Sequence, residues 1–363
     1  MTPSDIAYPR LYNQRIVGPR CADPAEVVRW LGAMQAQDYH QALWAIGLRT
    51  LRSTVADVEQ AIADRKILRT WPMRGTIHFV PSEDARWMLQ LTASWMLARD
   101  GRRQEQLGLD EGVMERCKGL FYDALQGGRR LLRSEMLSVL EAAGISTSNQ
   151  RGYHILWYVS QCGVICLGPM QDKQQTFVLL DEWAPYARAL SREEALAELT
   201  TRYFASHGPA TTHDFAWWTG LTVADAKAGL ESARPGLISV AVNGKDYWMT
   251  PDALDRAAYT DPDIYLLPGF DEYLLGYKDR SAVLAAEHAQ RVVPGNNGVF
   301  LPVIVAGGRV IGTWKRTVKK KAVELTLSPF TALHAPHHKV ADAANSYSAF
   351  LGLPLSAITV SNH

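Results

Sequence analysis

The amino-terminal part of the chain shows the apolar spacing of helices, followed by that of a hairpin. Asp23 stands before a proline, the order in which a capping residue and a first-turn proline begin a helix. Apolar residues then recur at helical spacing, which predicts a helical face reaching Met34. A second helix is predicted from about Thr54, and strands are predicted at 67–70 and 76–80. Helix, helix and hairpin is the order of a winged helix-turn-helix.

The same order of elements recurs in the middle of the chain. The pattern predicts helices at 132–143 and 148–160, followed by strands at 164–167 and 176–180 around a polar loop. We expect Tyr153 to face the core together with the other apolar residues of its helix.

A third copy begins at Ser191 and Glu194, which have the spacing of a capping box. Helices are predicted at 211–218 and 222–232, and Asn243-Gly244 between two apolar runs is a strong hairpin signal. Three successive copies predict three tandem winged helix-turn-helix units. The alternative is a generic α+β protein without such a repeat.

From about residue 261 the pattern changes to short strands and turns. Strands are predicted at 264–267, 299–305, 309–314 and 323–327, and a closing helix at 339–351. The predicted fold class is therefore α+β, with three tandem winged helix-turn-helix units and a β-rich carboxy-terminal part. The predicted domains are residues 1–125, 126–188, 189–260 and 261–363.

The composition is that of a globular protein with large cores, because hydrophobic residues make up 47% and charged residues 21% of the 363 residues. No apolar run is long enough to span a membrane, and the first residues lack the apolar core of a secretory signal. The four scattered cysteines are expected to be reduced thiols, so we expect a soluble cytoplasmic protein. The net charge of +1 neither indicates nor excludes a nucleic-acid binder, since basic residues can gather on one face.

Two glutamines separated by one small residue, Gln35-Ala36-Gln37, form the first candidate for a chemical site. On extended or turning backbone both amides can point into one space, whereas at a helix end they can cap carbonyl groups. The spacing alone favours the capping role. The neighbouring Asp38 is expected to be a solvent-facing acid of the turn, with a role as a base as the alternative.

The densest basic run covers residues 314–321 and follows a predicted hairpin. Its basic side chains can neutralise backbone phosphates, and Trp314 can act as a stacking or a packing anchor. A solvated charge run is an equal alternative. Arg69 and Arg74, which flank the first predicted hairpin turn, are further candidates for nucleic-acid contacts, and weaker basic clusters lie at 99–103 and 129–133.

Two adjacent carboxylates, Asp271 and Glu272, follow a strand-like run. In a strand they would face opposite ways, so they are not expected to form an acid–base pair. A structural network is expected instead, with Asp271 or Asp279 pairing with Arg280. A site role for Asp271 or Tyr273 is the alternative.

No metal or cofactor site is expected from the sequence. The histidines of residues 334–338 have no partner cluster, and the proline among them indicates an irregular loop. Cys162 and Cys166 have no second pair with which to bind zinc. Gly307-Gly308 lacks the following helix that a phosphate-binding loop requires.

Several stretches of the chain match one known family. They are Leu31-Gly32-Ala33-Met34-Gln35-Ala36-Gln37 before Ala42-Leu43-Trp44, residues 74–78, residues 267–277 with Asp279-Arg280, and residues 312–316. Together they resemble the AlkZ/YcaQ-type DNA glycosylases over almost the whole chain. The resemblance implies three winged-helix units in a concave, C-shaped body that receives duplex DNA. It also implies a Gln-hydrophobic-Gln catalytic motif, here Gln35 and Gln37 around Ala36.

With this resemblance the basic candidates gain a common role. The residues expected to bind DNA are Arg69, Arg74, Arg280, Trp314, Lys315, Arg316 and Lys319.

The chemistry of a glutamine pair restricts the substrate. Breaking a base–sugar bond passes through an oxocarbenium-like state, for which enzymes usually supply a carboxylate. A glutamine amide is no base, and it can only orient water and offer a carbonyl dipole to positive charge. That help suffices where alkylation at N7 or N3 has already made the purine a cation.

We therefore expect a monofunctional DNA glycosylase that acts as a monomer on duplex DNA with alkylation damage, without cofactor or metal. Gln37 positions the water, and Gln35 assists it and stabilises charge. The alternative is a non-catalytic winged-helix DNA-binding protein or regulator. A regulator normally dimerises to match two half-sites, whereas this chain has no evident dimerisation helix. A hydrolase using Asp38 or Asp271 is a third interpretation.

Overall fold

Helices begin where the sequence places capping residues. Helix α2 (Pro24–Leu31) starts at Asp23, whose carboxylate accepts hydrogen bonds from the backbone N–H groups two and three residues further on. Helix α10 (Arg192–His207) starts at the predicted box, in which the Glu194 carboxylate accepts from the Ser191 N–H at 2.8 Å and the Ser191 hydroxyl accepts from the Glu194 N–H at 3.3 Å. Both capping predictions are confirmed.

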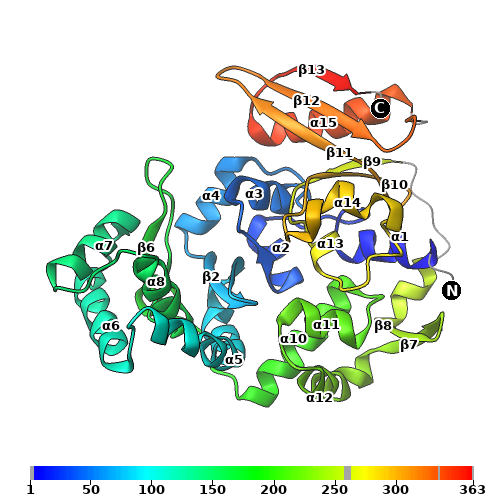
Figure 1. The fold of residues 1–363 in the computed structure, drawn as a ribbon. Helices are drawn as coiled ribbons and strands as arrows, with labels where there is room; N and C mark the ends of the chain where they lie inside the picture. Colours follow the sequence, from blue (N-terminus) through cyan, green and yellow to red (C-terminus); the bar gives the residue numbers. More distant parts are fainter. Residues whose placement is uncertain (1–3, 257–262, 334–335, 362–363) are drawn as a thin grey trace. The chain divides into compact units, whose positions relative to one another are not determined.

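The computed structural model describes residues 4–256, 263–333 and 336–361. The chain forms two compact units of mixed helix and strand, so the predicted α+β class is confirmed (Figure 1). The N/C unit comprises residues 1–58, 197–218 and 222–363, and the middle unit comprises residues 59–196 and 219–221. Within the described residues, no helix has both the length and the apolar composition needed to cross a membrane.

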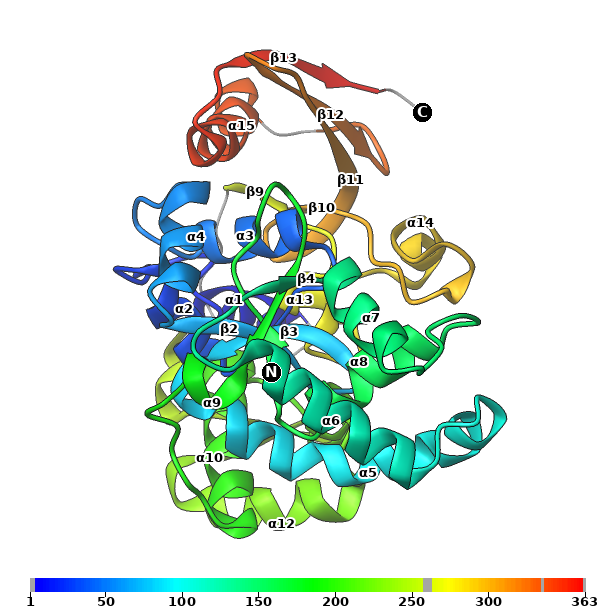
Figure 2. The same cartoon turned by 90° about the vertical axis from the view of Figure 1, so that its left-hand side faces the viewer.

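The middle unit is built on an antiparallel sheet. Its strands are β2 (Ile67–Met73), β3 (Thr76–Pro81), β4 (Leu131–Leu132), β5 (Ile165–Leu167) and β6 (Thr176–Leu179), in the order β3-β2-β5-β6-β4. Its helices are α5 (Ala85–Gln106), α6 (Glu111–Leu125), α7 (Arg133–Ala142), α8 (Arg151–Gln161) and α9 (Leu180–Trp183), and α4 (Val55–Ala63) leads into it. Helices α6, α7 and α8 lie close together in Figure 2. Their apolar side chains form one core with those of β5 and β6.

The N/C unit is assembled from three separate stretches of the chain. The first holds α1 (Ser4–Asn13), α2, β1 (Met34–Gln35) and α3 (Tyr39–Gly47). The second and the start of the third hold most of α10, α11 (Thr212–Thr219), α12 (Val223–Ala233) and the hairpin of β7 (Ile238–Val242) and β8 (Lys245–Met249). The remaining elements are β9 (Ile264–Leu267), α13 (Glu272–Leu275), α14 (Ala289–Val292), β10 (Val303–Ala306), β11 (Arg309–Val318), β12 (Val323–Pro329), α15 (His337–Leu351) and β13 (Leu355–Val360).

The carboxy-terminal part of the N/C unit is a five-stranded sheet of order β13-β12-β11-β10-β9. Neighbouring strands are antiparallel except β12 and β13, which are parallel. Helix α15 contacts β9 and β13 and lies along one face of this sheet in Figure 1. The β-rich character predicted for this part is confirmed, although β13 was not predicted.

The helix–helix–hairpin order occurs in each of the three predicted stretches. Helices α7 and α8 precede the β5–β6 hairpin, and α11 and α12 precede the β7–β8 hairpin. Asn243 and Gly244 have φ values of 50° and 74°, the sign that a two-residue type I′ turn requires. In the first stretch a further helix, α3, lies in sequence between α2 and α4. The periodicity did not reveal α3. The winged-helix assignment and the four domain boundaries stay predictions.

Two side chains differ from their predicted positions. The first helix ends before Met34, because Gly32 turns the backbone to a φ of 82° and Met34 then lies in β1. Tyr153 was expected to face the core but is 47% exposed. The buried stripe of α8 contains Ile155, and two residues along a helix place side chains on nearly opposite faces.

A cluster of aromatic rings joins α3 to α15. The Trp44 ring lies 5.1 Å from that of Tyr347 and 5.2 Å from that of Phe350, and its indole N–H donates to the Leu266 carbonyl at 2.7 Å. Gly47, one helical turn from Trp44, lets the Phe350 ring approach the backbone of α3 so closely that a methyl group there would overlap the ring.

Gly47→Ala is expected to lower the free energy of unfolding by about 1–3 kcal/mol, because the added methyl group forces the Phe350 ring out of its packed position. Gly119→Ala is the matched control, since Gly119 lies on the exposed face of α6 with open space around it. It should stabilise by about 0.5–1 kcal/mol through its helix propensity. Urea denaturation measures both, and equal effects of the two substitutions would contradict the packing argument.

Candidate functional site

The glutamine motif lies on a short connection between two helices. Helix α2 ends at Gly32, Gln35 lies in the short strand β1, and α3 begins after Asp38. Asp38 is the N-cap of α3, because its carboxylate accepts a hydrogen bond from the Gln41 N–H at 3.2 Å. Gln35 is therefore on extended backbone rather than at a helix end. The solvent-facing turn acid predicted at Asp38 is confirmed, because its side chain is exposed.

The three motif residues differ in their exposure. Ala36 is 1% exposed and Gln35 9%, whereas Gln37 is exposed to solvent. The motif thus runs from a buried glutamine to an accessible one. A ligand that arrives from solvent can therefore reach the Gln37 side chain, whereas little of Gln35 is accessible.

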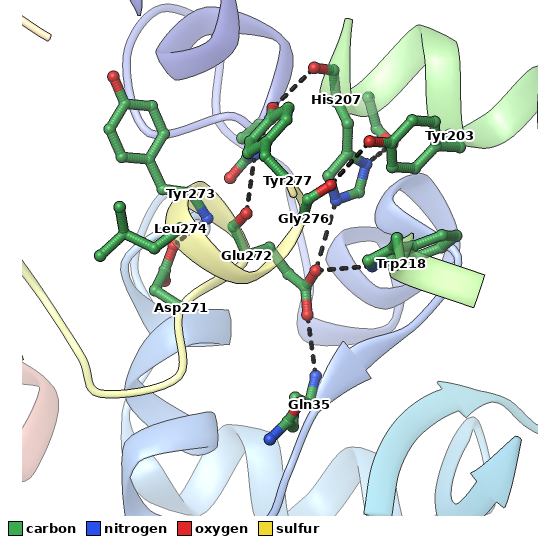
Figure 3. A network of polar contacts seen from close by, with 12 residues as sticks. Gln35, Tyr203, His207, Trp218, Asp271, Glu272, Tyr273, Leu274, Gly276 and Tyr277 are labelled. Atoms are coloured by element: carbon green, nitrogen blue, oxygen red, sulfur yellow. Dashed lines mark hydrogen bonds and ion pairs between the residues drawn. The ribbon is translucent and has the colours of Figure 1, made fainter. Parts of the chain in front are cut away.

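A buried carboxylate holds the backbone of the motif. The Glu272 Oε1 atom accepts a hydrogen bond from the backbone N–H of Gln35 at 3.0 Å, and its Oε2 atom accepts from the indole N–H of Trp218 at 2.8 Å. Figure 3 shows the Glu272 side chain reaching from α13 toward both donors. The backbone nitrogen of Gln35, rather than its side-chain amide, faces the carboxylate.

A neutral histidine completes this group. His207 Nε2 lies 3.5 Å from Glu272 Oε2, and the His207 ring is stacked on Tyr203 with 4.7 Å between the ring centres. Burial lowers the pKa of His207, and the opposing effect of Glu272 is smaller. The lowered pKa favours the uncharged imidazole. The two N–H donors, rather than an ion pair with His207, therefore stabilise Glu272.

The carboxylate next to Glu272 forms a separate buried pair. Both Asp271 oxygens accept hydrogen bonds from the Arg49 guanidinium at 2.8 Å, and the two side chains are buried. Asp271 also caps α13 by accepting from the Tyr273 N–H. The predicted structural network is present, but the two carboxylates start a helical turn instead of lying in a strand.

The predicted partner of this network was wrong. Asp271 pairs with Arg49, and Asp279 pairs with Lys245 at 2.6 Å, so neither carboxylate pairs with Arg280. Arg280 Nε donates to the Leu274 carbonyl at 2.7 Å, and its guanidinium lies over an aromatic ring. Its place beside the aromatic rings reflects the weak hydration of guanidinium, which stacks more readily than an ammonium group.

The basic run at residues 314–321 is divided between the core and the surface. Lys315 on β11 and Lys319, the first residue after that strand, are exposed, and Arg316 on β11 is partly buried. Lys319 forms an ion pair with Glu324 on the neighbouring strand. Trp314 is 1% exposed, and its indole N–H donates to the Leu267 carbonyl at 2.8 Å. Trp314 is therefore a packing anchor, and its assignment as a DNA-binding residue was wrong because no face of its ring is open.

The two arginines near the first hairpin have different environments. Arg74 lies at the turn between β2 and β3 with a φ of 51°. Arg69 lies within β2, its side chain is buried, and its Nη2 atom contacts the Met170 sulfur at 3.4 Å. Arg69 does not flank the turn, and its burial contradicts the prediction that it binds DNA.

Sequence reasoning missed the residues that hold the motif. Trp218 and His207 carry no local motif, and Glu272 was assigned to a network without its contact to Gln35. The only signal was indirect, because the stretch at 267–277 and the glutamine stretch both belong to the family resemblance. Among the described residues no three His, Cys, Asp or Glu side chains gather as a metal site. His334 and Ala335 lie outside the described residues.

Comparison with known proteins gives a consistent result. A family model described as DNA glycosylase AlkZ-like matches residues 28–350. A curated protein of Streptomyces sahachiroi, named interstrand DNA cross-link repair glycosylase, is 28% identical over 338 residues, which are 88% of this chain and 88% of that protein. The solved structure of Streptomyces sahachiroi DNA glycosylase AlkZ has a similar fold, with a TM-score of 0.83 and 24% identity over 99% of this chain and 100% of that one.

Asp271→Asn is expected to lower the free energy of unfolding by about 3–5 kcal/mol, because it leaves the buried Arg49 guanidinium without a countercharge. Glu231→Gln is the matched control, since Glu231 pairs with Arg234 in an exposed position of the same unit. Its effect should stay below about 0.5 kcal/mol. Urea denaturation distinguishes the two, and a small loss for Asp271→Asn would show that the buried pair does not anchor α13.

Proposed function

Because the chain belongs to the AlkZ-like family of DNA glycosylases, we propose that it hydrolyses the N-glycosidic bond of cationic N-alkylated purines in duplex DNA. Family membership confirms the enzyme class predicted from the sequence, and it removes the support for a non-catalytic regulator. The proposed substrates carry the adduct at N7 or N3 and include bulky or crosslinked purines. The name of the Streptomyces sahachiroi relative supports the crosslinked class. We propose that the enzyme acts as a monomer.

The main support for this proposal is that both carboxylates considered as bases already have structural contacts. Asp38 caps α3, and Asp271 is buried in a bidentate pair with Arg49. The exposed Gln37 beside the nearly buried Gln35 is left as the polar group of the motif that a ligand can reach. An amide cannot remove a proton from water, so the reaction depends on a leaving group that needs none.

The proposed reaction balances without an enzyme base. The carbonyl dipole of Gln37 orients a water molecule toward C1′ of the damaged nucleotide, and Gln35 stabilises the positive charge that develops on the sugar. The bond from C1′ to the purine nitrogen breaks, and its electron pair neutralises the cationic base. The water oxygen bonds to C1′, and its proton passes to solvent.

The exposed basic residues at the end of β11 and just after it are proposed to hold the DNA backbone. Lys315 reaches solvent from the strand that also carries the partly buried Arg316, and Lys319 follows the end of that strand. Arg74 and Arg280 remain proposed contacts, since the first lies at a turn and the second is only partly buried. Such contacts position the duplex without reading its sequence.

Gln37→Ala is expected to slow the release of N7-methylguanine from duplex DNA by about a hundredfold or more, because the water loses its preorganised dipole. The measurement is single-turnover base release with detection of the abasic site. Gln60→Ala is the control, since Gln60 is an exposed glutamine on α4. Full activity of Gln37→Ala would refute the site, and the absence of base release by the unsubstituted enzyme would refute the substrate class.

Lys315→Ala is expected to weaken binding to any duplex and to lower the slope of log affinity against log salt by about 1, the loss of one phosphate contact. Lys227→Ala on the exposed face of α12 is the matched control and should leave the slope unchanged. Fluorescence anisotropy between low and moderate salt measures both. An unchanged slope for Lys315→Ala would place the DNA elsewhere.

A further inference from the structure

The buried carboxylate of Glu272 has no part in the proposed reaction, yet it contacts the motif directly. Glu272 is 1% exposed, and its Oε1 atom accepts from the backbone N–H of Gln35. We infer that Glu272 is a positioning residue, whose hydrogen bond to the Gln35 backbone fixes the orientation of both motif glutamines. The inference rests on the proposed function of Gln35 and Gln37 and assigns them a support.

The support is rigid because α13 is held at both ends. Asp271 caps the helix and is paired with Arg49, while at the other end the Tyr203 hydroxyl donates to the Gly276 carbonyl at 2.7 Å. The ring of His207 lies against Gly276 so closely that a methyl group there would be only 2.6 Å from its Cδ2 atom. The backbone that carries Glu272 therefore has no room to shift without unpacking its neighbours.

The identity of the residue as a carboxylate follows from its partners. Gln35 and Trp218 both present N–H donors to it, and a carboxylate is an acceptor at both oxygens. A glutamine in the same place would turn its NH₂ group toward one of these donors and lose that contact. Both Glu272 oxygens are thus used as acceptors of N–H hydrogen bonds, which is the arrangement that suits a carboxylate.

The consequence for the motif is positional. Glu272 sits 237 residues from Gln35 in the chain, so one hydrogen bond ties the connection between α2 and α3 to a distant element of the same unit. Without this hydrogen bond, the two-residue strand β1 loses its contact with Glu272, and the amides of Gln35 and Gln37 can move. A displacement of about 1 Å in a reacting geometry costs roughly a hundredfold in rate.

The test is Glu272→Gln in the full chain, with two readouts. Single-turnover release of N7-methylguanine is expected to slow between about tenfold and a hundredfold, with the duplex Kd changed less than twofold. In ¹⁵N-labelled protein the Gln35 amide proton is expected to shift upfield and to exchange with solvent at least tenfold faster. Trp218→Phe, which removes the second donor, is expected to cause a smaller shift of the same resonance and serves if Glu272→Gln fails to fold.

Tyr273→Phe is the matched control. Its hydroxyl is buried on the same helix and contacts the Gly308 carbonyl at 2.6 Å, so the substitution removes a buried hydrogen bond without touching the Glu272 carboxylate. It should lower stability and leave both the rate and the Gln35 resonance unchanged. A general loss of structure would instead change the stability, the rate of base release and the Gln35 resonance together.

The outcomes separate this inference from the proposed function. An unchanged Gln35 resonance in folded Glu272→Gln overturns the positioning role, whatever happens to the rate. A shifted resonance with an unchanged rate also overturns it, because the orientation then has no effect on catalysis. If the unsubstituted enzyme releases no base, the proposed function fails, and the resonance alone still decides whether Glu272 holds the motif.

Discussion

The candidate site depends on burying two adjacent carboxylates, Asp271 and Glu272, without leaving either one unsatisfied. An isolated buried carboxylate is costly, so each must find donors that match its oxygens. Asp271 meets the fork of Arg49, and Glu272 meets two N–H groups from separate elements. These contacts tie α13 to the beginning of the chain and to α11. One of the donors to Glu272 is the backbone N–H of Gln35, so the hydrogen bonds of this pair also connect the glutamine motif to α13.

Local chemistry explains which elements could be predicted from the sequence. The caps at Asp23 and Ser191 and the turn at Asn243-Gly244 depend on atoms only a few residues apart. The alternation of polar and apolar residues and their helical spacing likewise depend on residues that are close together in the chain. For this reason the three hairpins and the helices before them, except α3, were placed nearly correctly, and the position of the motif just after the first helix was predicted.

The residues that sequence reasoning misplaced are those whose environment is set over long distances. Arg49 and Asp271 are 222 residues apart, and no local pattern distinguishes Arg49 from Arg280 as the partner. Trp314 and Arg69 lie in basic or hairpin segments that suggest a surface, but packing buries both. A positive charge in the sequence therefore predicts a phosphate contact only where the fold leaves the side chain exposed, as it does for Lys315.

The same constraint narrows the chemistry of the motif. A glycosylase for neutral bases needs an acid to protonate the leaving group or a carboxylate near the sugar. Here the fold uses Asp38 to begin a helix and Asp271 to neutralise an arginine, and Glu272 turns to the backbone of Gln35. The carboxylates nearest the motif in sequence or in space thus have structural contacts, and the exposed residue of the motif is Gln37. Under the proposed function the damage itself then supplies the driving force, which favours cationic purines over neutral lesions.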